Sequence, residues 1–172
     1  MDITQLILDE HAQQRNLFAQ IEQIDAKDAA VLSSLWKRLR ALLDSHAEAE
    51  ERFFYPRLMQ IGKGANDADS AADETEDAIE DHNEIRDTAA AVDKEDVGSK
   101  TWFSALGKCN KANGDHMAEE ERQGLTDFRR QASLQERHDL AVKFAAFEAD
   151  HLLGVKPVDK DPKAWVKDHA PD

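Results

Sequence analysis

The feature that most constrains this chain is an internal repeat of a charged, histidine-containing segment. His46 to Arg52 and His116 to Arg122 both have the pattern H-x-x-x-E-E-R, and their histidines are 70 residues apart. Glu10-His11 and Asp81-His82 follow almost the same shift, 71 residues, and each has an arginine four residues after the histidine. Internal repeats can decide a whole fold. We therefore interpret the chain as a duplicated helical hairpin, with one lone histidine and one His/Glu pair in each half.

Apolar residues recur at helical spacing along most of the chain, and no segment shows the alternation of a strand. The predicted helices cover residues 4–25, 29–61, 68–93, 100–130 and, after a capping box at Ser133, the stretch to about 153. Four long helices with short connections predict an all-α, up-down-up-down four-helix bundle, with the fifth helix packed outside it.

The length of 172 residues suits one domain. We assign residues 1–153 to the bundle, with its core at 4–130, and residues 154–172 to an extended or partly disordered tail that Trp165 docks on the bundle. Pro56 is expected to kink the second helix near its end.

The candidate functional residues lie at even intervals on these helices. The steps between His11, His46, His82 and His116 are 35, 36 and 34 residues. In an antiparallel bundle that rises about 1.5 Å per residue, equal steps bring residues to similar heights. Each histidine lies on the apolar stripe of its helix, so each should point inward. Glu50 and Glu120 follow a histidine by four residues, one turn along the same face.

Two glutamates in a buried layer need a positive partner. An unpaired buried carboxylate costs several kcal/mol, a large share of the total stability of a fold, about 5–15 kcal/mol. No inward lysine is evident; Arg15 and Arg86 could contribute. A bound cation fits better, because imidazoles and carboxylates are ligands of iron, manganese or zinc. The lack of thiolate argues against a structural zinc site, and six ligands from four helices favour two ions over one.

With these residues in place, the chain resembles the hemerythrin-like family, also called the HHE cation-binding domain. The resemblance covers roughly residues 4–130 and includes the continuation from Glu50 to Pro56. It implies an oxo- or hydroxo-bridged pair of iron ions in a four-helix bundle. The ligands implied are His11 and His46 for one iron, His82 and His116 for the other, and Glu50 and Glu120 as bridges.

One position departs from the family's oxygen carriers, which have a second histidine four residues after the third-helix histidine. Arg86 occupies that position here, which argues against reversible oxygen carriage. We expect a protein that binds or senses oxygen, peroxide or nitric oxide through its metal centre. The alternatives are a di-iron enzyme with catalase-like or ferroxidase activity, a non-catalytic metal-sequestering module, and a helical interaction domain without metal.

Other polar residues have simpler expected roles. Glu10 and Asp81 could orient metal-binding side chains, but adjacent residues point about 100° apart on a helix, so we expect them to face solvent. Glu119 and Glu121 are expected to face solvent or a neighbouring helix. Cys109 is expected to be a small core residue. Surface or packing roles are expected for Glu148, His138, His151 and His169 and for the acidic run from Asp67 to Glu84.

Charge and composition exclude some partners. The net charge of −14 argues against nucleic acid and anionic membranes. A single cysteine allows no intrachain disulfide, the N-terminus lacks the pattern of a signal peptide, and no stretch approaches the ~18 apolar residues of a membrane span. We expect a cytoplasmic protein, and a homodimer is compatible with the fifth helix.

Overall fold

The computed structural model describes residues 1–66 and 68–170 of the chain. Asp67, Pro171 and Asp172, which the loop and tail predictions include, lie outside the described residues. The described secondary structure is all helical, as predicted. The elements are α1 (Ile3–Glu22), α2 (Ala29–Ala49), η1 (Glu50–Phe54), α3 (Tyr55–Ile61), α4 (Ala71–Asp93), α5 (Lys100–Arg122), α6 (Gly124–Gln131), α7 (Leu134–Asp150) and α8 (Pro162–His169).

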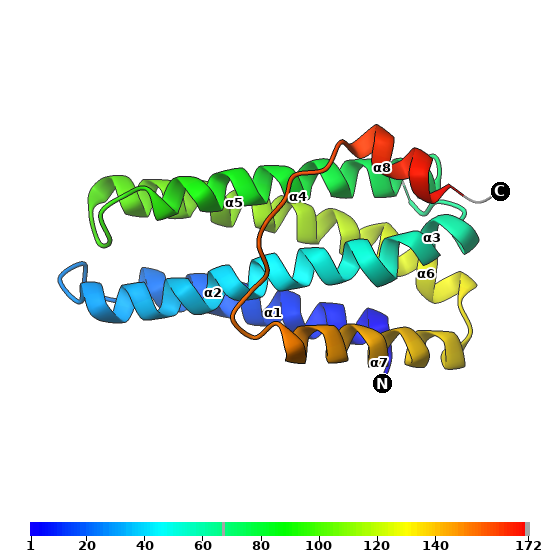
Figure 1. The fold of residues 1–172 in the computed structure, drawn as a ribbon, viewed down its shortest axis with the longest axis horizontal. Coiled ribbons are helices and arrows are strands. Elements are labelled where there is room, and N and C mark those ends of the chain that lie inside the picture. Colours follow the sequence, from blue (N-terminus) through cyan, green and yellow to red (C-terminus); the bar gives the residue numbers. More distant parts are fainter. Residues whose placement is uncertain (67, 171–172) are drawn as a thin grey trace.

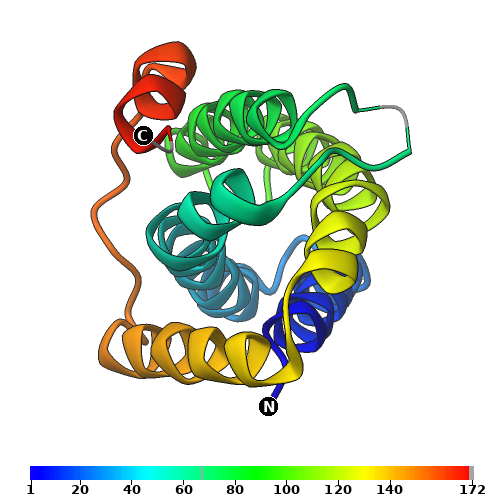
Figure 2. The same ribbon diagram turned by 90° about the vertical axis from the view of Figure 1, so that its right-hand side faces the viewer.

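The long helices α1, α2, α4 and α5 lie lengthwise beside one another (Figure 1). The turns that follow α1 and α4 lie at one end of the molecule, and the N-terminus and the connection after α3 lie at the other. In the end view, α7 runs along one side, and a connecting strap leads from it to α8 at another corner (Figure 2). Contacts join α7 to α1, α2 and η1, and α8 to α4.

Most helices start where a short polar side chain caps the first turn. Such a side chain accepts a hydrogen bond from a backbone N–H that has no partner within the helix. Asp2, Ser70, Ser99, Ser133 and Asp161 cap α1, α4, α5, α7 and α8 in this way. The predicted cap at Ser133 is therefore confirmed.

Two helices predicted to be continuous are interrupted, one within the repeated motif and the other just after it. The prediction of one helix over residues 29–61 was wrong in detail, because a π-helical turn, η1, separates α2 from α3. The helix predicted over 100–130 breaks at Gln123, where the backbone leaves the helical region with φ −101° and ψ −86°. Gly124 follows this break and begins α6. In each half of the repeat the regular α-helix thus ends at or near the adjacent glutamates.

Smaller differences concern the ends of the elements. The first helix ends at Glu22 rather than residue 25, the third begins at Ala71 rather than 68, and the fifth ends at Asp150 rather than 153. The prediction of an extended tail was wrong for Pro162–His169, which form α8. Trp165 of this helix is buried against the bundle as expected.

The apolar core forms two clusters along the bundle. One cluster includes Ile7, Ile79, Phe128 and Trp165. The other includes Leu17, Trp36, Ile85 and Trp102 toward the opposite end of the helices. On α1, the candidate ligand His11 falls between Ile7 and Leu17, and on α4 His82 falls between Ile79 and Ile85. The layer of buried histidines and glutamates therefore lies between two apolar clusters that keep water from both sides.

Candidate metal centre

The four predicted histidines are buried and lie in one layer. His11 comes from α1, His46 from α2, His82 from α4 and His116 from α5. None is more than 4 % exposed. The rings of His11 and His46 have centroids 5.1 Å apart, and those of His82 and His116 are 4.6 Å apart. The structure thus brings the histidines together as two pairs.

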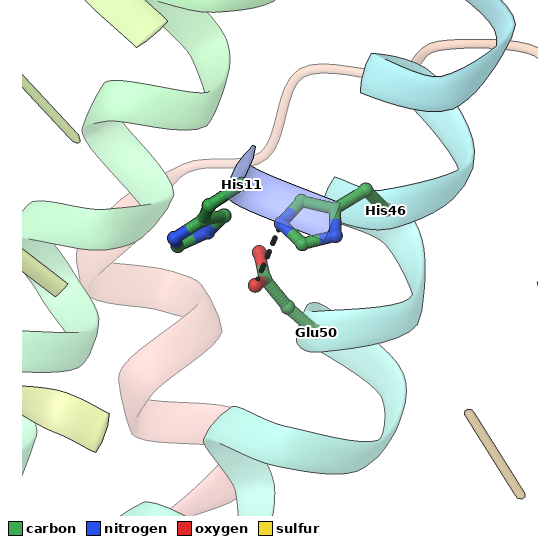
Figure 3. Close-up of side chains that lie close together, drawn as sticks. All are labelled: His11, His46 and Glu50. Atoms are coloured by element: carbon green, nitrogen blue, oxygen red, sulfur yellow. Dashed lines mark ion pairs between the residues drawn. The ribbon is translucent and has the colours of Figure 1, made fainter. Parts of the chain in front are cut away.

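Glu50 lies between the two pairs. Its Oε1 is 3.0 Å from Nε2 of His46, and its Oε2 is 3.2 Å from Nε2 of His82. Neither oxygen has a hydrogen bond, and the carboxylate is fully buried. Figure 3 shows the imidazole rings of His11 and His46 and the carboxylate of Glu50 lying close together, with His11 on one helix and the other two residues on another. Two groups that could each hold an ion result, one of His11, His46 and Glu50 and the other of Glu50, His82 and His116.

Glu120, the second predicted bridge, has one carboxylate oxygen beside a histidine and the other bound to a tyrosine hydroxyl. Its Oε2 is 3.3 Å from Nε2 of His11 and has no hydrogen bond. Its Oε1 accepts a hydrogen bond of 2.9 Å from the hydroxyl of Tyr55. Burial, and then the nearby carboxylates Glu120 and Glu50, raise the pKa of Tyr55 well above its ordinary value, so this tyrosine keeps its proton.

Each histidine also faces an outer carboxylate through its Nδ1 atom. Glu10 lies 2.6 Å from Nδ1 of His46, Glu51 lies 2.8 Å from that of His82, and Glu121 lies 3.0 Å from that of His11. Asp81 is 3.4 Å from Nδ1 of His116. The pairs follow the repeat. Glu10 and Asp81, which precede the lone histidines, each contact the histidine of the next long helix. Glu51 and Glu121, the last glutamates of the two motifs, each contact a lone histidine.

The preferred expectation of solvent exposure was wrong for Glu10 and only partly right for Asp81, and both residues lie beside a histidine. Glu10 is buried, and the side chain of Asp81 is only 31 % exposed. Adjacent helical residues do point about 100° apart. In a bundle, however, that rotation carries the side chain into the seam with the neighbouring helix rather than into water. The recurrence of an acid at the same place in both halves of the repeat was the signal that could have found them.

Glu51 forms ion pairs with two basic residues, and sequence analysis had not predicted either pair. Arg86 donates a hydrogen bond of 2.6 Å to its Oε1, and Lys160 of the strap forms an ion pair with its Oε2. Burial alone would raise the pKa of Glu51, but His82, Arg86 and Lys160 together lower it to about 2. Arg86, at the position of the extra histidine in the oxygen carriers, therefore stabilises an outer carboxylate instead of approaching the centre.

The charges of the inner groups depend on one another. Burial opposes ionisation, yet the carboxylates of Glu50 and Glu10 raise the pKa of His46 well above its ordinary value. The same contacts, from His46 and His82, lower the pKa of Glu50 well below its ordinary range despite its burial. Without a metal ion, the layer is therefore an ion-pair network in which protons on imidazoles balance buried carboxylates.

The donor atoms of the layer fit a metal ion. An ionised carboxylate only accepts hydrogen bonds, so an outer carboxylate holds the ring proton on Nδ1 and leaves the Nε2 lone pair pointing inward. Nε2 of His82 and Nε2 of His116 are 3.2 Å apart, a contact that needs a proton on one of the two nitrogens. A cation held by these Nε2 atoms and the oxygens of Glu50 would replace that proton and would satisfy the carboxylate.

The π-helical turn begins at the candidate ligand Glu50. Such turns are rare and often occur at functional sites. The turn shifts the phase of the helix, so that Glu50, Glu51, Phe54 and Tyr55 are all buried within six residues. One short segment thereby supplies an inner carboxylate, an outer carboxylate and the hydroxyl that binds Glu120.

The fifth helix contributes a residue close to the layer. Glu148, expected to have a surface or packing role, lies within 4.8 Å of Glu10 and of a ring nitrogen of His46, measured between possible ligand atoms. Burial, and then the hydrogen bond with Glu10, raise the pKa of Glu148 to about 9. This environment favours the protonated form of Glu148 at neutral pH. His151 is not part of this group; its Nδ1 is 2.7 Å from the carbonyl oxygen of Phe147.

The remaining expectations have mixed outcomes. His138 and His169 are exposed, and Cys109 is buried in the core, all as predicted. The acidic run is not wholly a solvated face, because Glu74 is 5 % exposed. Its Oε1 accepts a hydrogen bond of 2.9 Å from the backbone N–H of Ala65.

Comparison with known proteins gives one match. Residues 2–126 match the family model described as the hemerythrin HHE cation binding domain. Searches of curated proteins and of solved structures found no significant match. Among the described residues, no helix has the length and apolar character needed to cross a membrane.

Proposed function

We propose that this chain, which belongs to the hemerythrin HHE cation-binding domain family, is a non-haem di-iron protein that binds a small ligand such as oxygen, peroxide or nitric oxide. In this proposal His11 and His46 hold one iron, and His82 and His116 hold the other. Glu50 and Glu120 bridge the two ions. Manganese or zinc would use the same donor atoms.

The observation that carries the proposal is the position of Glu50. This buried carboxylate has no hydrogen bond, yet each of its oxygens lies within 3.2 Å of Nε2 of a histidine from a different pair. A structural ion pair would need only one such contact. A carboxylate that reaches both pairs is the arrangement expected of a bridge between two ions.

The surrounding residues support small-ligand chemistry at such a centre. A pair of iron ions supplies redox chemistry and coordination positions that the protein does not fill. The chain itself orients the imidazoles through their outer carboxylates and excludes bulk water with its apolar clusters. The alternation of the connections between the two ends of the molecule (Figure 1) supports an up-down-up-down arrangement of the four ligand-bearing segments.

A second candidate function is consumption of peroxide, and Tyr55 favours it. Its hydroxyl donates a hydrogen bond to Glu120 and keeps its proton, so a hydrogen-bond donor for bound peroxide stands beside the proposed bridge. The two functions differ in turnover. Oxygen evolution from added peroxide that falls in Tyr55→Phe would support the enzyme, whereas spectral change without turnover supports ligand binding.

Metal analysis tests the metal centre itself. After anaerobic reconstitution with ferrous iron, the protein should contain about two irons per chain. Glu50→Ala and His116→Ala should lose the bridged centre, together with its charge-transfer absorption in the presence of azide. Glu48→Ala is the matched control, because Glu48 is on the same helix but pairs with Arg52 and Lys160 outside the layer.

Two results would contradict the assignment. One is a metal content below about one ion per chain in the unaltered protein. The other is a full metal load with an unchanged spectrum in either Glu50→Ala or His116→Ala, because both residues would then be dispensable.

A further inference from the structure

A narrow cavity leads from the surface to the candidate metal centre between α3, α4, α5 and the start of α6. Its inner wall includes Tyr55, His116 and Glu120, and its outer wall includes Asp77, Asp81 and Glu119. The free space amounts to about 10 Å³, enough for about one water molecule. A bare or partly dehydrated ion therefore fits the cavity, whereas a large organic molecule does not.

The cavity is lined by carboxylates and by no lysine or arginine among the residues that the structure describes. Burial, and then the charges of Glu119 and Asp81, raise the pKa of Asp77, so these groups act on one another. Arg122, which does not line the cavity, lies 3.9 Å from Glu119. Clustered charge of one sign beside low-dielectric walls raises the local concentration of ions of the opposite sign. The lining therefore attracts cations and repels anions.

Glu74 gives this acidic cavity a feature that exposed acidic clusters lack. Its side chain is 5 % exposed and lines the cavity, and its Oε2 atom has no hydrogen-bond partner. Leaving a buried carboxylate oxygen without a partner costs free energy that a nearby cation would recover. Burial raises the pKa of Glu74 to about 7, so an arriving cation can displace its proton near neutral pH.

We propose that this cavity is the route by which a divalent cation reaches the metal centre, with Glu74 and Asp77 as transit ligands before His116. Among the described residues, no three side chains of the outer wall lie close enough to chelate an ion together. The cavity is therefore suited to passage rather than storage. This inference rests on the proposed metal centre and adds residues to which the family match assigns no role.

The test measures how fast the metal-free protein takes up Co²⁺, whose visible absorption reports bound ions. Glu74→Gln and Asp77→Asn each replace one carboxyl group of the route with an uncharged amide. Glu84→Gln is the matched control, because Glu84 is exposed on the same helix outside this cavity. Uptake should slow about tenfold in either route variant and stay within about twofold in the control. The final stoichiometry and spectrum should be unchanged in all three.

Ionic strength provides a second readout. Uptake by the unaltered protein should slow as salt increases, and the route variants should depend on salt less. Asp77 is exposed, so Asp77→Asn tests the route even if Glu74→Gln alters folding. Route variants that load as fast as the control would overturn this inference and leave the metal centre intact. Failure of the unaltered protein to bind Co²⁺ would overturn the metal centre and the route with it.

Discussion

Replacing Glu51 with glutamine should destabilise the metal-free protein by about 3 kcal/mol at neutral pH. The buried carboxylate has a pKa of about 2 in the folded protein, against 4.5 for an ordinary glutamate. Because one pKa unit corresponds to about 1.4 kcal/mol, this difference gives the estimate. A second argument agrees in size: removing one member of a buried ion pair, here with Arg86, costs about 3–5 kcal/mol.

The pH dependence of this effect has a definite sign. The pKa of Glu51 is lowered by folding, so its contribution is fully present above pH 4.5 and is lost as the pH falls toward 2. Urea unfolding of Glu51→Gln and the unaltered protein, both without metal, should therefore differ most at pH 7. The difference should shrink to roughly half by pH 3.

Glu48→Gln provides the control for this measurement. Glu48 also pairs with Lys160, at 2.9 Å, but it contacts neither His82 nor Arg86 and is partly exposed. Its replacement should cost less than about 1 kcal/mol, as is usual for exposed ion pairs. Equal losses in Glu48→Gln and Glu51→Gln, or a Glu51→Gln loss that does not change with pH, would refute the reasoning.

Three further predictions follow from burial and charge. Metal binding should release protons and tighten as the pH rises above neutrality, because the raised pKa of His46 keeps its imidazole protonated in the metal-free protein. Calorimetry in buffers of different ionisation enthalpy measures the number of protons released. Metal binding without proton release would contradict this prediction. Trp165→Ala should cost about 2–4 kcal/mol of unfolding free energy and make α8 sensitive to limited proteolysis; unchanged digestion would mean that Trp165 does not hold α8. Cys109 should react with a thiol reagent only when the protein unfolds, since burial raises its pKa to about 12; rapid labelling of the native protein would contradict its core position.

The buried histidines and the two predicted bridging glutamates could be predicted, because the repeat and the apolar pattern both place these residues in one buried layer. His11, His46, His82 and His116 each occupy an apolar stripe, and a stripe that faces a core fixes the direction of every side chain on it. Even spacing along antiparallel helices then sets the height of each residue. Glu50 and Glu120 follow from the same geometry because they lie one turn further along.

The outer part depends on which helices are neighbours, and periodicity within one helix does not contain that information. Glu10 was expected in solvent because it lies off the apolar stripe, but it fills the seam between α1 and α2 and reaches His46. The doublets that contain Glu51 and Glu121 were visible in the sequence, yet their partners lie on other helices. Recurrence in both halves of the repeat was the available signal.

The C-terminal segment could be predicted only in part. Trp165 was expected to dock as a large apolar side chain in a polar tail, and it is buried. The helix around it is only eight residues long, too short for a periodic pattern to stand out. Lys160 gave no signal, because its contact with Glu51 joins residues 109 positions apart. The π-helical turn was also missed, since the spacing of residues in the motif is the same whether the segment is α-helical or π-helical.

The most direct test of the central claim is a crystal structure of the iron-loaded protein with anomalous diffraction recorded on both sides of the iron absorption edge. The account predicts two iron peaks about 3–4 Å apart, with Glu50 between them and the four histidines around them. A single peak, or peaks away from this layer such as beside Glu10 and Glu148, would contradict it.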